Sequence, residues 1–417
     1  MLWILLLILV VVSLLYSLWY FSLRKNAAPS VKIKEELSVR RWDLDFLESK
    51  RKHTDPLADN VIEQIMTKGE LEIVNKLFRA INETAEEIPD HLPAEVKKYF
   101  LETEKLPDWA DPKLIEMGQE VYARNGVYVG MLLSFKSLPE CYSGAKGANV
   151  LHHTGRLNHS HGAQNAFARR IAETAQFVIL AMSPGGLDPQ GKGIRAAQKV
   201  RLIHAVIRYY LRKHQWDADA FGEPINQEDM AGTLMSFSAL ILEGLELLDV
   251  ELSHDEKEAY IHTWRVVGHF MGVDPELLPN NAADALALGH AIIDHQKGES
   301  EQGKSLMKAL IEFNENSFPI KMHPNTLYKM YRYLIGEELA GYLGIPKVEK
   351  DDLEDFAEDF REIVGTISDI SQNAMLALMM KGIGKIMLTA MINFMDENQK
   401  INFYIPESLQ KDWGLNN

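Results

Sequence analysis

The chain of 417 residues has an ordinary globular composition, with 46% hydrophobic and 25% charged residues. Its 59 acidic residues outnumber its 44 basic ones, which argues against a nucleic-acid partner because phosphate binding requires clustered Lys and Arg. A single cysteine, Cys141, excludes an internal disulfide framework and zinc sites built from several thiolates.

The first 23 residues form a distinct apolar segment. Residues 2–23 carry no charge and as a helix would span ~33 Å, enough to cross a bilayer core. Trp3 near one end and Trp19 near the other are placed as interfacial anchors are. Basic residues follow this segment and none precedes it, which predicts a single-pass membrane protein with the remaining chain on the cytoplasmic side. A long signal sequence is the alternative.

The next part, residues 24–59, is polar and contains Pro29 and Pro56, which predicts a tether with only local helix. Apolar residues then recur with helical spacing between positions 60 and 87. Farther along, Asp111 followed by Pro112 is typical of a helix start. We therefore expect a helix from Lys113 that continues through the apolar run at 126–135.

Later segments carry helical periodicity too, namely 228–249, 253–271, 283–296, 302–315 and 324–343. Sustained period-two alternation with Asn-Gly or Asp-Gly turns is missing, so the predicted fold class is all-α. Residues 348–364 predict an acidic amphipathic helix docked on the core through Leu353, Phe356, Phe360 and Ile363. The Met-rich segment 373–395 indicates a core helix, with an interfacial membrane helix as the alternative.

Two helices joined by a glycine-rich loop are expected between Gln164 and Lys213. The loop, Gly186 to Gly193, superficially matches a phosphate-binding loop. However, Gly193 stands where such a loop has Ser or Thr, and a helix rather than a strand precedes it. An interhelical loop is the prediction.

The second of these helices places one histidine on its apolar face. Val200, Ile203, Ile207 and Leu211 form the stripe, and His204 falls on it. Arg201 and Arg208 project within roughly 60° and 40° of that histidine. An imidazole between two guanidinium groups should stay neutral and free to ligate a metal, although a satisfied core histidine is the alternative.

The first helix carries polar residues on its apolar face as well. Arg170, Glu173, Thr174 and Phe177 share a face at helical spacing. Buried charges are costly unless they are paired or functional, so this face indicates either an ion pair or a site.

A separate cluster of histidines occupies a segment rich in Gly, Asn and Ser: His152, His153, His159 and His161. It offers a non-haem metal site, but no carboxylate stands at facial-triad spacing. Hydrogen-bonded or solvent-facing histidines are the simpler interpretation.

Five motifs together resemble the rubber oxygenase (latex-clearing protein) family. They are Leu106-Pro-Asp-Trp109, Ser137-Leu-Pro-Glu-Cys-Tyr142, Thr154-Gly-Arg156, Arg170-Ile-Ala-Glu-Thr174 and, most specifically, Val200-Arg-Leu-Ile-His-Ala-Val-Ile-Arg208. The family includes the membrane-bound oxygenase that cleaves a farnesyl chain in mycophenolic acid biosynthesis. The resemblance covers about residues 100 to 346.

The resemblance implies a globin-like, orthogonal multi-helix domain that holds haem b. His204 matches the proximal iron ligand, and Arg201 and Arg208 match the arginines that flank it. Arg170 and Thr174 match polar residues of the neighbouring haem-pocket helix and, with Glu173, are the candidate catalytic residues. Glu173 departs from the pattern, because rubber-cleaving members have a lysine there.

These observations predict four parts: a membrane anchor (1–23), a tether (24–59), a catalytic domain (60–346) and a helical extension (347–417). The predicted function is a membrane-anchored, haem b-dependent oxygenase that uses O₂ to cleave C=C bonds of a hydrophobic isoprenoid or lipid-like substrate. The alternatives are a haem- or lipid-binding protein without turnover and a non-haem metal enzyme that uses the histidines of 152–161.

Overall fold

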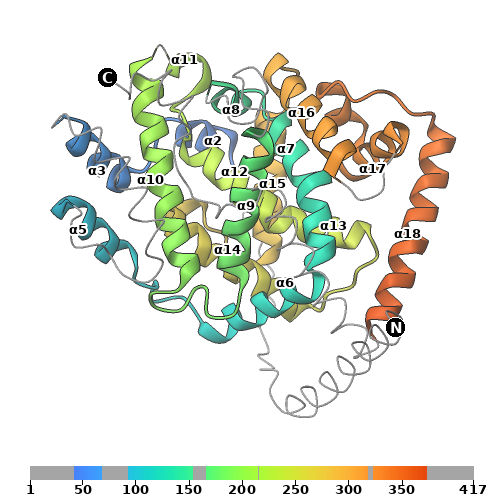
Figure 1. The fold of residues 1–417 in the computed structure, drawn as a ribbon, viewed down its shortest axis with the longest axis horizontal. Coiled ribbons are helices and arrows are strands. Elements are labelled where there is room, and N and C mark those ends of the chain that lie inside the picture. The colour runs from blue at the N-terminus through green and yellow to red at the C-terminus, as the bar shows by residue number, and fades with distance from the viewer. Residues whose placement is uncertain (1–41, 68–92, 154–165, 215, 318–322, 373–417) are drawn as a thin grey trace, which may run out of the picture.

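The computed structural model describes residues 42–67, 93–153, 166–214, 216–317 and 323–372 (Figure 1). Apart from an isolated bridge between Gly144 and Lys297, all regular structure in these ranges is helical. The all-α prediction is confirmed for this part of the chain. The expected anchor (1–23) and the Met-rich segment (373–395) lie outside the described residues.

The first half of the described chain runs through α2 (Leu44–Lys50), α3 (Pro56–Thr67), α5 (Ala94–Thr103), α6 (Pro112–Leu132), the π-helix η1 (Leu133–Ser137), α7 (Leu138–Ser143), α8 (Ala148–His153), α9 (Ala166–Met182) and α10 (Lys192–Lys213). The second half contains α11 (Ala218–Phe221), α12 (Gln227–Phe237), α13 (Ala239–Leu247), α14 (His254–Met271), the 3₁₀ helix η3 (Pro275–Leu277), α15 (Ala282–Gln296), α16 (Glu301–Ser317), α17 (Pro324–Tyr342) and α18 (Lys350–Gln372).

Local sequence signals explain where α6 begins. Asp111 precedes the helix, and its side chain accepts a hydrogen bond from the backbone N–H of Lys113 at 2.8 Å, with Pro112 in the first turn. The helix then runs without interruption into η1 and α7. The predicted start at Asp111-Pro112 and its continuation through 126–135 are confirmed.

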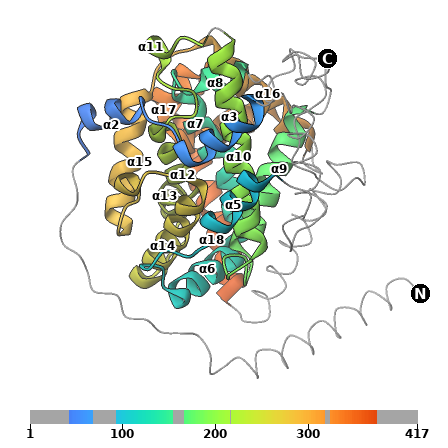
Figure 2. The ribbon, with the colours of Figure 1, turned by 90° about the vertical axis from the view of Figure 1, so that its left-hand side faces the viewer.

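Helix α10 takes part in both apolar clusters formed by the described residues. It packs against α9, α14 and α3, and Figure 2 shows α3 and α5 in front of it. Ile194 and Ala197 belong to the main core, whereas the stripe predicted from the sequence belongs to a smaller cluster with α3 and α5. All four stripe residues, Val200, Ile203, Ile207 and Leu211, are buried.

The folded body starts earlier than the predicted boundary at residue 59. In the expected tether, Leu47 is fully buried in the main core and Arg51 is 1% exposed. Arg51 donates hydrogen bonds to Glu228 at 3.0 Å and to Asp229 at 2.9 Å. Residues 44–59 are therefore packed structure, because charged partners far along the chain hold this polar segment in place.

The predicted helix 228–249 is two helices, since α12 and α13 are separated by Ser238 with φ −120° and ψ −88°. The Ser238 hydroxyl donates to the carbonyl of Leu234 at 2.7 Å, a side-chain bond of the kind that bends helices. Helices α12 and α13 together (Gln227–Leu247) are the one described stretch long and apolar enough to cross a membrane. In its most apolar 18 residues, 67% are buried inside the protein. Its place in the protein is the core.

At the other end of the described chain, α18 docks on the core through two of the four residues predicted for this contact. Phe356 and Phe360 pack against the main core, and the acidic residues between them are exposed. Figure 1 shows this helix along the edge of the molecule, next to α17.

Helices α6 and α14 approach each other closely at Gly118. A Cβ at this position would lie 2.2 Å from Thr263 Oγ1 and 2.5 Å from the carbonyl oxygen of Ala259. Gly118→Ala is therefore expected to lower the free energy of unfolding by about 2–3 kcal/mol, because the two helix backbones must separate. Gly130→Ala, in the same helix with nothing within 4 Å, should instead stabilise by about 0.5–1 kcal/mol. Urea denaturation of both variants measures the difference, and equal effects would contradict it.

Candidate functional site

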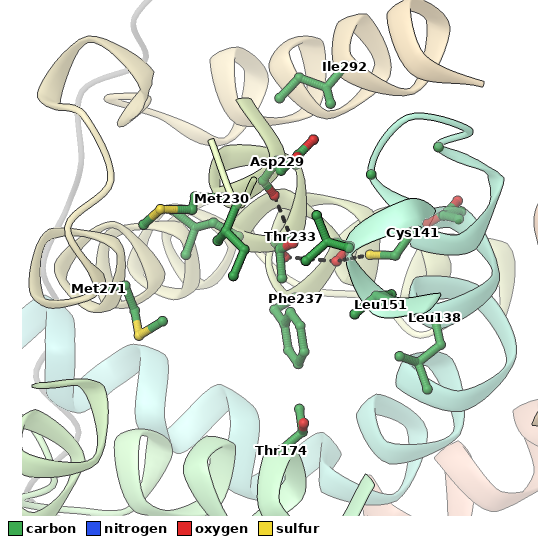
Figure 3. Close-up of a pocket in the computed structure, with 18 of the residues that line it drawn as sticks. Leu138, Cys141, Leu151, Thr174, Asp229, Met230, Thr233, Phe237, Met271 and Ile292 are labelled. Carbon is green, nitrogen blue, oxygen red and sulfur yellow. Dashed lines mark hydrogen bonds between the residues drawn. The ribbon is translucent and has the colours of Figure 1, made fainter. Parts of the chain in front are cut away.

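A cavity of about 290 Å³ lies between α7, α8, α9, α10, α12, α14 and α15. Its wall is mostly apolar, with few polar side chains, which is the usual make-up of a small-molecule site. Figure 3 shows Thr174 of α9 facing Phe237 of α12 across the cavity, with Asp229 and Thr233 farther along α12.

Three of the six predicted site residues line this cavity: Arg170, Thr174 and His204. Arg170 and Thr174 are one turn apart on α9, where the Thr174 hydroxyl donates to the Arg170 carbonyl at 2.9 Å. His204 comes from α10, which packs directly on α9. The polar groups on the apolar faces of the two helices therefore meet at one cavity.

The imidazole of His204 is neutral at pH 7. Burial, together with the positive charges of Arg208 and Arg170, lowers the pKa of His204 to about 3. Its Nδ1 is buried and has no hydrogen-bond partner among the described residues. The predicted neutral state agrees with this environment, but the second guanidinium is that of Arg170 and not that of Arg201.

Arg201 and Arg208 are absent from the cavity wall. Arg201 binds Asp55 with two hydrogen bonds, from Nε at 2.5 Å and from Nη2 at 2.7 Å. Arg208 donates from Nε to Asp59 at 2.6 Å. Around the axis of α10, both arginines point tens of degrees away from His204. Their long side chains therefore reach the start of α3 and the residue before it, and not the cavity.

Glu173 is fully buried but does not line the cavity. Its carboxylate lies 4.0 Å from the guanidinium of Arg170. Of the two interpretations of this helix face, the geometry favours the ion pair for Glu173, while Arg170 and Thr174 reach the cavity.

The histidine cluster of 152–161 is described only in part. His153 is exposed, its Nδ1 lies 2.8 Å from the carbonyl oxygen of Asn149, and its ring packs edge-on against Trp216. No group of three or more His, Cys, Asp or Glu in the described ranges is placed to hold a metal ion. His159, His161 and the side chain of His152 lie outside those ranges.

A buried carboxyl group on the cavity wall was not predicted from the sequence. Glu140 of α7 accepts a hydrogen bond from the buried ammonium of Lys136, which also donates to Glu243 at 2.8 Å. Burial raises the pKa of Glu140 to about 7, against the lowering effect of Lys136. The sequence feature that indicates this ion pair is the spacing of four residues between Lys136 and Glu140 in an apolar stretch.

Asp229 also lines the cavity, and no local sequence pattern predicts that it does. Its two carboxylate oxygens accept hydrogen bonds from Arg51 at 2.9 Å and from Asn226 at 2.8 Å. The arginine lies 178 residues earlier in the chain, so only the folded structure reveals the pair.

The acid stability of the protein is expected to depend on Glu243. Burial alone would raise the pKa of Glu243. The hydrogen bonds with His290 and Lys136 outweigh this effect and lower that pKa from 4.5 to about 2. A lowered pKa stabilises the fold above pH 4.5, and this contribution is lost as the pH falls toward 2. Glu243→Gln should therefore reduce the free energy of unfolding by about 2–3 kcal/mol at pH 7 and progressively less below pH 4.5.

Urea denaturation between pH 7 and pH 3 measures this dependence. Glu246→Gln is the matched control on the same helix, because its ion pair with Lys257 is at the surface and is expected to contribute less than about 1 kcal/mol. Parallel stability curves for Glu243→Gln and the parent would contradict the assignment.

Comparisons with known proteins agree with the motifs found in the sequence. The family model of the ER-bound oxygenase mpaB/B′ and rubber oxygenase catalytic domain matches residues 125–368. The rubber oxygenase of Streptomyces sp. (strain K30) is 26% identical over 299 residues, which are 70% of this chain and 71% of that protein.

A solved structure, that of latex-clearing protein in the closed state, has the same fold. Its TM-score is 0.70 at 22% identity, and the likeness covers 86% of this chain and 95% of that one. The family match also extends beyond residue 346, where the resemblance was expected to end, into α18. Because the family model covers more than half of the sequence, the chain belongs to the ER-bound oxygenase mpaB/B′ and rubber oxygenase family.

Proposed function

We propose that this member of the oxygenase family depends on haem b and uses O₂ to cleave C=C bonds in a hydrophobic isoprenoid or lipid-like substrate. The observation that carries the proposal is the neutral imidazole of His204 on the wall of an apolar cavity, with an Nδ1 that has no partner among the described residues. An unpartnered buried polar atom is costly, and a role in holding a bound group accounts for it.

The chemistry of the cavity wall fits this cofactor. A neutral imidazole nitrogen is a common axial ligand of haem iron. Arg170 is the only Arg or Lys among the described residues of the wall, and a guanidinium is suited to pair with a haem carboxylate. When bound, the haem supplies the activation of O₂.

The side chains of this chain have separate tasks in the proposal. His204 would hold the iron, Arg170 would pair with a carboxylate of the cofactor, and Glu173, whose carboxylate lies 4.0 Å from the guanidinium, would orient Arg170. Phe177 and the other apolar wall residues exclude water and accommodate a hydrocarbon. With its pKa near 7, Glu140 is able to take up or release a proton at the cavity.

The substrate class follows from the relatives and from the apolar wall. The relative from Streptomyces is named a rubber oxygenase, and polyisoprene is a long unsaturated hydrocarbon. We therefore include polyisoprenoids of different lengths among the candidate substrates. A membrane-dissolved chain would suit a protein held at the bilayer.

Membrane attachment through residues 1–23, with the catalytic domain on the cytoplasmic side, is part of the proposal. The uncharged stretch and the basic residues after it support this topology. Alkaline washing of membranes, followed by protease treatment of sealed vesicles, tests it. Release of the protein by the wash, or protection of the domain in cytoplasm-side-out vesicles, would overturn it.

An absorption spectrum of the purified full chain tests the cofactor, and O₂ consumption with a panel of polyisoprenoids tests the reaction. We expect a Soret band and O₂ uptake with at least one substrate. Haem without O₂ uptake would favour a haem- or lipid-binding protein without turnover. Zinc or non-haem iron without haem would favour a metal enzyme using the histidines of 152–161.

A further inference from the structure

The start of α3 lies against the outer face of α10, where it binds both arginines that bracket His204. Asp55, just before α3, binds Arg201, and Asp59, in its first turn, binds Arg208. These four residues are nearly buried, with side-chain exposures of 3% and 13% for the aspartates and 10% and 1% for the arginines. The match to the oxygenase family begins only at residue 125, so the two aspartates lie outside it.

The geometry of the Asp55–Arg201 pair leaves it little freedom. Two parallel hydrogen bonds of 2.5 and 2.7 Å join the carboxylate to the guanidinium, the strong bidentate arrangement. Gly272, with φ +80°, covers the pair so closely that a Cβ there would lie 2.5 Å from Arg201 Nε and 2.7 Å from Asp55 Oδ2. A side chain at position 272 would therefore displace the pair.

The second pair is fixed by hydrogen bonds from its own segment. The Asp59 carboxylate accepts a hydrogen bond from the Thr54 hydroxyl at 2.8 Å while it binds Arg208 at 2.6 Å. Arg208 also donates to the carbonyl of Ile225 at 3.3 Å, and Ile225 lines the cavity. Both ion pairs of α10 thus have further contacts with neighbouring segments.

His204 lies three residues after Arg201 and four residues before Arg208, so its direction depends on the rotation of α10. A rotation of about 20° about the helix axis would move the imidazole by about 2 Å, which is more than a preorganised site tolerates. Two anchors seven residues apart, on the face next to the histidine, oppose such a rotation.

We infer that Asp55 and Asp59 are positioning residues of the candidate site, which hold the arginines on either side of His204 and thereby set the direction of its imidazole into the cavity. The inference rests on the proposed function where it concerns the iron ligand. Its purely structural part, the fixed rotation of α10, does not.

The experiment compares Asp55→Asn and Asp59→Asn with two matched controls in the full chain. Glu104→Gln removes the ion-pair partner of Arg195, whose guanidinium lies 2.9 Å from the Glu104 carboxylate. Arg195 is on α10, as Arg201 and Arg208 are, but it lies nine residues before His204. Lys50→Met breaks the pairs of Lys50 with Asp274 at 2.6 Å and with Glu276 at 2.5 Å. Lys50 belongs to the same N-terminal segment as the two aspartates, but neither of its pairs involves α10. Each of the four variants loses at least one ion pair, and Asp59→Asn and Lys50→Met each lose two, so general destabilisation is common to variants and controls.

In the haem-loaded protein, the two aspartate variants should release haem at least ~10-fold faster, as expected for the loss of residues that orient a ligand. They should also change the electron paramagnetic resonance signature of the ferric iron, which reports the orientation of an axial imidazole. The controls should stay within ~2-fold of the parent and keep its signature. Equal behaviour of aspartate variants and controls would overturn the inference.

Hydrogen exchange of the cofactor-free chain provides a second, independent readout. Asp55→Asn and Asp59→Asn should increase exchange of the amides at 200–208, whereas Glu104→Gln and Lys50→Met should not. A parent that never binds haem would refute the proposed function alone, and this measurement would then decide the positioning role. Unchanged exchange at 200–208 in both aspartate variants would refute that role.

Discussion

His204→Ala is expected to abolish haem binding and, with it, O₂ consumption. The imidazole is the only one among the described residues of the cavity wall, and its lowered pKa keeps it in the neutral, ligating form at pH 7. Without it the two carboxylates of the wall, Glu140 and Asp229, remain paired with cations, and burial raises the pKa of the Cys141 thiol to about 11, which keeps it protonated. The Soret band should disappear or shift strongly, and activity should fall by at least ~10³-fold, as for loss of a group on which the reaction depends.

His153→Ala is the matched control, because this neighbouring histidine is exposed on α8 and does not line the cavity. It should keep the spectrum and the activity of the parent. Imidazole added to His204→Ala should restore part of the Soret band if the ring acts as a ligand. A folded His204→Ala protein with an unchanged spectrum would falsify the assignment.

Arg51→Met is expected to produce the largest loss of stability, about 3–5 kcal/mol, the range for breaking a buried ion pair on one side. Arg51 is 1% exposed and donates to Glu228, which has no exposed surface, and to Asp229. Burial already raises the pKa of Glu228, against the lowering effects of His295 and Arg51. Removing the guanidinium leaves that carboxylate with His295, 2.5 Å away, as its remaining described partner.

Urea denaturation monitored by circular dichroism measures this loss. Arg124→Met breaks an exposed ion pair with Glu256 and should change the stability by less than about 1 kcal/mol. The double variant Arg51→Met with Glu228→Gln should recover part of the loss, because the buried negative charge is gone. A single variant as stable as Arg124→Met would show that Arg51 does not hold the N-terminal segment to α12.

The elements that could be predicted from the sequence are those with local signals. The stripe of α10 repeats every three to four residues, and the start of α6 depends on Asp111 and Pro112, which are adjacent. The sequence predicts a tether for residues 24–59 because the polar residues of this segment find their partners only after folding. Arg51 and Glu228 are 177 positions apart, and Asp55 and Arg201 are 146 apart.

Only part of the candidate site can be predicted from the sequence, because its assembly also depends on contacts between distant segments. Helical spacing identifies which side chains share a face to within tens of degrees, but it does not tell which helix covers that face. His204, Thr174 and Arg170 reach the cavity, whereas Arg201 and Arg208 bend toward α3 and Glu173 packs inside the protein. Glu140 stands in one of the five family motifs, but its place in the site depends on burial, which spacing alone does not show.

The π-helix η1 lets the chain length vary beside the cavity wall. It joins α6 to α7 without a break, and its hydrogen bonds span five residues instead of the four of an α-helix. Five residues of a π turn cover about the same rotation as four residues of an α-helix, so deleting one residue between 133 and 137 would give one regular α-helix and leave α7 in nearly the same orientation. Glu140 would keep its place on the wall, so the chain can lose a residue at η1 without losing this part of the site.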